Sequence, residues 1–108
     1  MKLERIEIED NKVIVLLDAQ TSGLTIWPGF DNKDKKVTLK YIGDKSYGYV
    51  EKLEFTARLS EEPLNIYIQE YEWGKGGRKR LYVLNIANNS VTLQKIKDEA
   101  TGWFRILR

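Results

Sequence analysis

The residues best suited to binding chemistry gather in one stretch, Leu64–Ile86, which reads LNIYIQEYEWGKGGRKRLYVLNI. Four cations and three glycines lie near its centre, and aromatic residues flank them. Lysine and arginine bind phosphate groups by releasing counterions, and arginine also forms paired hydrogen bonds. Exposed tyrosine and tryptophan stack on bases. The candidate residues for binding a nucleic acid or another partner are Tyr67, Tyr71, Trp73, Lys75, Arg78, Lys79, Arg80 and Tyr82.

Carboxylates offer the other chemistry in this stretch. Glu70 and Glu72 share one face of an extended strand at roughly 7 Å, near the spacing of paired acids in glycosidases. Any two alternate strand residues have that spacing, so it is weak evidence. A nuclease that works without histidine is the one enzyme hypothesis, with Arg78 and Arg80 stabilising the phosphorane and Glu70 or Tyr71 as the base.

Composition argues against an enzyme. The chain has no histidine and no cysteine, so it lacks the most used general bases, nucleophile pairs and metal ligands. The acids of Asp31–Lys36 do not follow the order of a calcium-binding loop. We therefore predict a non-enzymatic protein with no cofactor and no metal site.

Length and charge limit the other function classes. The 108 residues suit one domain, spanning residues 1–108. The 18 basic and 16 acidic residues leave a net charge of +2, so electrostatic binding has to come from local clustering. No apolar run reaches the ~18 residues of a membrane span, and the N-terminus lacks the apolar core of a signal peptide. We expect a cytoplasmic protein without a membrane partner.

Alternation of apolar residues with a period of two predicts strands along most of the chain. The turn residues Asp10-Asn11 predict a hairpin between Leu3–Glu9 and Val13–Leu17. This register keeps apolar residues together on one face and brings opposite charges together at the turn. The predicted partners are Glu9 with Lys12, Ile8 with Val13, and Ile6 with Val15.

A second hairpin is predicted around Asn88-Asn89, between Leu81–Ile86 and Ser90–Ile96. Its two-residue turn again produces one apolar face. The predicted partners are Ile86 with Val91, Leu84 with Leu93, and Tyr82 with Lys95.

The remaining segments have weaker signals. Proline after Leu24–Trp27 places this short strand at a sheet edge or ends it there. Two further strands alternate over Val37–Ile42 and Tyr47–Leu59, with Tyr41, Tyr47, Tyr49 and Phe55 predicted to face inward. We predict a turn at Asp18–Gly23, a loop at Gly74–Arg80, and either a loop or one helical turn at Asp98–Gly102. A closing strand is predicted at Trp103–Leu107.

The first arm of the central hairpin, Leu64–Trp73, has two different faces. Its even positions begin with Leu64, Ile66 and Ile68, which we predict to contact the core. Its odd positions carry Tyr67, Tyr71 and Trp73 on the opposite face. If that face is exposed, the aromatic residues and the basic loop form one binding surface.

Eight or nine short strands, mostly connected as hairpins, predict an all-β, single-domain antiparallel β-barrel or β-sandwich. The most concrete function is binding of single-stranded nucleic acid through the hairpin 64–86. Near-neutral charge and the neighbouring Glu70 and Glu72 weaken that hypothesis. Three alternatives stay open: a protein partner or self-association, a structural domain without nucleic acid, and a lipocalin-like barrel with a small ligand near Tyr47, Tyr49 and Phe55.

Overall fold

The computed structural model describes residues 1–21, 23–27, 36–43, 49–72 and 77–100. These residues form an almost entirely β structure, as the alternation predicts. The only helical element among them is η2 (Leu59–Glu61), a single 3-10 turn after β5. The strands are β1 (Lys2–Glu9), β2 (Lys12–Thr21), β3 (Leu24–Trp27), β4 (Val37–Ile42), β5 (Val50–Arg58), β6 (Leu64–Glu72), β7 (Arg78–Ala87) and β8 (Ser90–Ala100).

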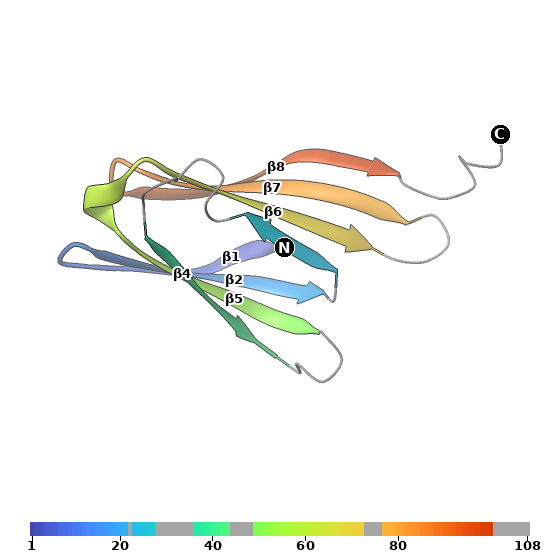
Figure 1. Cartoon of the computed structure of the whole chain (residues 1–108), viewed down its shortest axis with the longest axis horizontal. Helices are drawn as coiled ribbons and strands as arrows, with labels where there is room; N and C mark the ends of the chain where they lie inside the picture. Colours follow the sequence, from blue (N-terminus) through green and yellow to red (C-terminus); the bar gives the residue numbers. More distant parts are fainter. Residues whose placement is uncertain (22, 28–35, 44–48, 73–76, 101–108) are drawn as a thin grey trace.

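The strands make two four-stranded sheets, which lie as two layers in Figure 1. The first sheet has the order β1-β2-β5-β4, and the second sheet has the order β3-β6-β7-β8. Every strand pair is antiparallel. The described strands do not close into a barrel, because each sheet ends in two edge strands.

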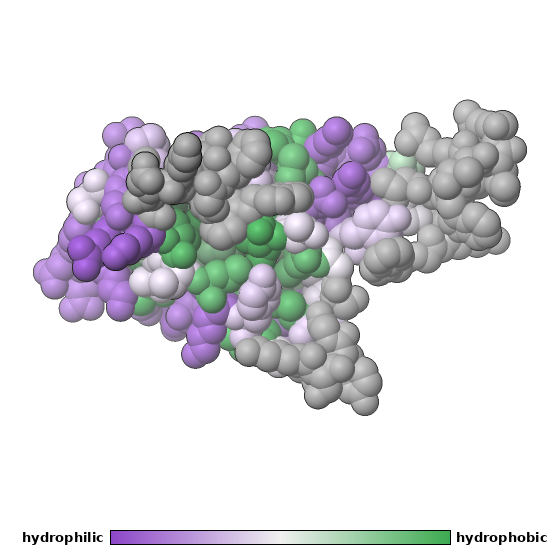
Figure 2. Space-filling model, viewed as in Figure 1, coloured by the Kyte–Doolittle hydropathy of each residue, from purple (hydrophilic) through white to green (hydrophobic). Residues whose placement is uncertain are grey.

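The core lies between the two sheets and comes mainly from their central strands. Alternate residues of β2, β5, β6 and β7 point to this side, so both sheets contribute one apolar face. Figure 2 shows apolar residues between the layers and polar residues around them. The fully buried side chains are Val13, Val15, Leu17, Leu53, Phe55, Leu64, Ile66, Ile68, Leu84 and Ile86.

Both predicted hairpin registers are confirmed. Ile8 pairs with Val13 across the first turn, and Leu84 pairs with Leu93 across the second. Asp10, Asn88 and Asn89 have φ between 53° and 58°. Asparagine and aspartate accept this left-handed conformation at low cost, which is why these pairs mark the turns.

Three segments predicted as turns or loops are partly strand. β2 continues to Thr21, β7 begins at Arg78, and β8 continues to Ala100. In the second sheet the cause is cross-strand pairing, since Arg78 lies between Glu72 and Ala100 and completes both ladders. Local turn propensity is weaker than the hydrogen bonds gained there.

Some predicted inward-facing residues are only partly covered or lie outside the described residues. Tyr41 pairs with the buried Leu53 and so lies on the predicted inner face, but it is 42% exposed because β4 is an edge strand. Tyr47 and Trp103–Leu107 lie outside the described residues. None of the described helical segments has the length and apolar character needed to cross a membrane.

Candidate functional site

The central hairpin consists of β6 and β7, which pair from Leu64 and Ile86 to Glu72 and Arg78. The predicted division of its first arm into two faces is confirmed on the core side. Leu64, Ile66 and Ile68 are fully buried, and Glu70 follows them on the same inner face with 8% exposure. Tyr67 and Tyr71 lie on the outer face and are half-buried.

The second arm divides the predicted binding residues between the two faces. Paired residues of adjacent strands share a face. Tyr82 pairs with Ile68 and Arg80 pairs with Glu70, so both lie on the inner face, as does Arg78. Lys79 pairs with Tyr71 on the outer face. Trp73 and Lys75 lie outside the described residues.

The inner-face arginines belong to a network that we call the Arg80 cluster: Glu70, Glu72, Arg78, Arg80, Lys95 and Asp98. Arg80 contacts Glu70 Oε1 through Nη1 at 3.0 Å and Glu72 Oε2 through Nη2 at 2.8 Å. Its Nε lies 3.7 Å from Asp98 Oδ2. Three cations therefore face three carboxylates. The apolar part of the inner face ends at this balanced group of charges.

Asp98 connects the other two cations of the Arg80 cluster. Arg78 Nε donates to Asp98 Oδ1 at 2.8 Å, and Lys95 Nζ donates to Asp98 Oδ2 at 3.0 Å. The bond from Lys95, with that from Arg78 second, holds the pKa of Asp98 below its usual value. The bond to Glu72 raises the pKa of Arg80 against the effect of burial. These cations already have anionic partners.

Tyr82 lies deeper than the cluster and is only 7% exposed. Burial raises the pKa of its phenol, and the charge of Glu70 adds to this effect. A neutral, covered tyrosine contributes to packing. The structure therefore places Tyr82 and Arg80 on the inner face, whereas Tyr67 and Tyr71 belong to the outer face of β6.

A polar pocket of about 350 Å³ adjoins the Arg80 cluster at the C-terminal end of β2. Tyr49 donates its hydroxyl to Gln20 Oε1 at 2.6 Å at this place. Of the four groups in the nuclease hypothesis, Glu70, Tyr71 and Arg80 line this pocket and Arg78 does not. Glu70 and Arg80 also form an ion pair with each other. The pocket is lined by Gln20, Thr21, Tyr49, Glu70, Tyr71, Glu72 and Arg80.

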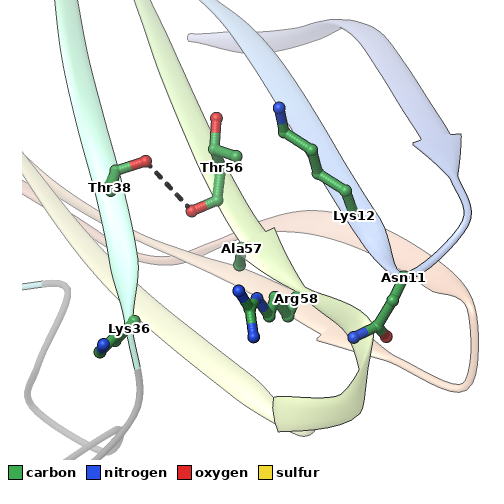
Figure 3. Close-up of a pocket in the computed structure, with 7 residues that line it drawn as sticks. All are labelled: Asn11, Lys12, Lys36, Thr38, Thr56, Ala57 and Arg58. Atoms are coloured by element: carbon green, nitrogen blue, oxygen red, sulfur yellow. Dashed lines mark hydrogen bonds between the residues drawn. The ribbon is translucent and has the colours of Figure 1, made fainter.

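A second group of cations lies on the outer face of the first sheet. Lys12 on β2 pairs with Arg58 on β5. Lys36 directly precedes β4, whose first residue pairs with Ala57, so Lys36 lies beside Arg58. We call Lys12, Arg58 and Lys36 the basic row. Figure 3 shows Lys12 on β2, Arg58 on β5 and Lys36 directly before β4.

The basic row borders a pocket of about 500 Å³ that also includes Asn11, Thr38, Thr56 and Ala57 (Figure 3). All three cations are exposed. Within the described ranges, none of them forms an ion pair. Two acids are near: Glu9 of β1 pairs with Lys12 across the first turn, and Glu61 Oε2 accepts a hydrogen bond from the backbone amide of Lys36 at 3.1 Å.

Hydrogen bonds between segments far apart in the sequence fix the end of the sheet that carries the basic row. Asn11, in the first turn, donates from Nδ2 to Ser60 Oγ and accepts at Oδ1 from the Ser60 amide, both at 2.9 Å. The Asn11 carbonyl accepts from the Leu59 amide at 2.8 Å. The turn is thus tied to η2, directly after Arg58. The Thr38 hydroxyl donates to the Thr56 carbonyl at 3.4 Å and joins β4 to β5.

Sequence reasoning missed the basic row. Its residues come from three separate segments, and the pairing of β2 with β5 connects positions far apart in the chain. The signal that was present is the alternation of Tyr47–Leu59, which places Arg58 on the polar face. Nothing in that alternation names Lys12 or Lys36 as neighbours of Arg58.

Among the described residues, no group of three acidic, histidine or cysteine side chains is placed to hold a metal ion. No protein-family model, no curated protein and no solved structure matches the chain. The chemistry of the two cation clusters is therefore the basis for a functional proposal.

Proposed function

We propose that the protein is a non-enzymatic binding module, an open β-sandwich that holds a linear polyanion on the basic row. Single-stranded nucleic acid is the most concrete ligand. The ligand class is the one predicted from the sequence. The proposed site differs from the predicted one, since it lies on the outer face of the first sheet and not on the hairpin.

The observation that carries this proposal is the direct adjacency of three cations that form no ion pair with any described residue. Like charges opposite each other on neighbouring strands destabilise a sheet. Lys12 and Arg58 are such a pair, and Lys36 adds a third charge on the far side of Arg58. A bound phosphate chain would remove this repulsion and release its own counterions.

The shape of the site favours a polymer over a single phosphate ion. Neighbouring strands lie about 4.8 Å apart, so three strands place the cations along a line of roughly 10 Å. The three side chains in Figure 3 come from neighbouring segments and do not converge on one point. Arg58 in the centre can bind a phosphate in a bidentate manner, with Lys12 and Lys36 on either side.

The hairpin offers less charge to such a ligand. Arg78 and Arg80 would have to leave carboxylates at 2.8–3.0 Å before binding phosphate. Of the described hairpin cations, only Lys79 is on the outer face beside Tyr71. Lys97 on β8 lies on the same face, opposite Leu81, and its Nζ is 3.9 Å from Glu99 Oε1.

Binding of a fluorescent single-stranded oligonucleotide, measured by anisotropy at several salt concentrations, tests the proposal. With three phosphate contacts, the logarithm of the association constant should fall against log salt with a slope of about −2. The double variant Lys12→Ser/Arg58→Ser should flatten the slope to about −0.7 and weaken binding most at low salt.

Lys79→Ser/Lys97→Ser is the matched control, because it removes the same net charge from the outer face of the second sheet. The proposal predicts that the control binds almost like the unmodified protein. If the control loses binding and Lys12→Ser/Arg58→Ser does not, the hairpin is the site. If the unmodified protein does not bind at low salt, nucleic acid is not the ligand.

A further inference from the structure

The edge strand β1 carries two isoleucines that face the core side without being covered. Ile6 pairs with Val15 and Ile8 with Val13, and both valines are fully buried. Ile6 and Ile8 therefore point to the inner side of the first sheet, yet they are 41% and 45% exposed. The second sheet does not extend far enough to cover β1 completely.

The four edge strands differ in how they are protected from pairing with another chain. β3 has only four residues. β8 has a register shift opposite Leu81 and Tyr82, and it presents Lys95 on the inner face. Bulges, inward charges and short length are the usual protections of an edge. β4 pairs without a shift, but Lys40 is its only charge, so two copies of β4 bring no opposite charges together. β1 pairs regularly from Arg5 to Glu9, beyond its shift at Leu3, and carries the exposed Ile6 and Ile8.

The charges of β1 fit a second copy of the same strand. In an antiparallel pair with Glu7 on the two-fold axis, Arg5 of each copy lies opposite Glu9 of the other. Ile6 then lies opposite Ile8, twice, on the inner face. The two Glu7 carboxylates meet at the axis, and each already has Arg5 Nε of its own chain at 3.2 Å.

We propose that β1 is a homodimer interface, in which two first sheets join edge to edge into one eight-stranded sheet. Two-fold symmetry makes the interface self-complementary, as in most dimers. The pair covers the exposed isoleucines and the free backbone groups of β1. Because few residues take part, the interface is smaller than the standard size, and the dimer is weak and reversible.

This proposal is independent of nucleic acid, but the two proposals fit together. A two-fold axis perpendicular to the sheet puts both basic rows on the same outer face. A polyanion that spans both rows would bind with higher avidity than one that reaches a single row.

Sedimentation of the full chain between about 1 and 300 µM, without nucleic acid, tests the dimer. The average mass should rise with concentration toward twice the monomer mass. Arg5→Glu or Glu9→Arg alone places like charges at two positions by symmetry and should weaken the dimer at least about tenfold. The double variant Arg5→Glu/Glu9→Arg exchanges the partners and should restore it.

Lys40→Glu is the matched control, since it reverses an exposed charge on β4, at the far edge of the same sheet. It should leave dimerisation unchanged. A monomer at all concentrations would overturn the proposal. So would a dimer that tolerates each single reversal, or one that the double reversal fails to restore. Circular dichroism of each variant confirms that it is folded.

Discussion

Two groups of three cations lie on different faces of the two sheets, one on the inner face of the second sheet and one on the outer face of the first, and their surroundings differ. In the Arg80 cluster, Arg78, Arg80 and Lys95 all contact carboxylates. In the basic row, Lys12, Arg58 and Lys36 are neighbours across the sheet. No described acid lies within ion-pair distance of any of them. The cluster that is conspicuous in the sequence is the neutralised one.

The difference follows from the face on which each group lies. The Arg80 cluster continues the inner face beyond the apolar core, next to Glu70 with 8% exposure and Tyr82 with 7%. A charge that loses solvent in such a place needs a partner. The basic row lies on an outer face where water solvates each cation, so the fold does not require a counterion.

Loss of Arg80 should have the largest effect on stability. Arg80→Ala leaves Glu70, Glu72 and Asp98 repelling one another, with Glu70 almost buried. Because Arg80 itself is partly exposed, we expect a cost of about 2 kcal/mol, below that of a fully buried pair. Urea unfolding followed by fluorescence measures it.

Lys12→Ala is the comparison variant and should change the free energy of unfolding by less than about 0.5 kcal/mol. The double variant Arg80→Met/Glu70→Met should recover part of the loss, because no charge of that pair stays buried. Equal costs for Arg80→Ala and Lys12→Ala would mean that the two cation groups do not differ in the way described.

The second largest effect should come from loss of Asp98, and this effect on stability should depend on pH. Its pKa is lowered in the folded protein, so its contribution to stability is complete above the usual pKa near 3.8 and disappears as the pH falls through the lower folded value. Asp98→Asn should lower the melting temperature at pH 7, and this difference should shrink below about pH 4. A difference that stays constant from pH 7 to pH 2 would argue against the ion pairs.

The smallest effect should come from the basic row and should have the opposite sign. Arg58→Ser removes the central cation between Lys12 and Lys36. We expect a gain in stability of up to about 0.5 kcal/mol at low salt, and the gain should vanish near 1 M salt because exposed charges are screened. A loss of stability would show that Arg58 stabilises the sheet.

The sequence by itself determined the strands, both tight hairpins and the core face of β6. These features depend on local patterns: alternation with a period of two, and Asp or Asn where φ is positive. The same patterns predicted loops that are longer than those observed. Arg78, for example, is part of a strand because it pairs with Glu72 and Ala100. Residues near a predicted turn cannot show how far their partners continue.

Only the tertiary structure decided which cations are available. Arg80 has Glu70 in its own hairpin but Asp98 and Lys95 on β8, and Lys12 meets Arg58 only because β2 pairs with β5. These contacts depend on strand order, which the alternation of single strands does not encode. The set of charged side chains around a cation is therefore a property of the assembled sheets. It decides where a polyanion can bind.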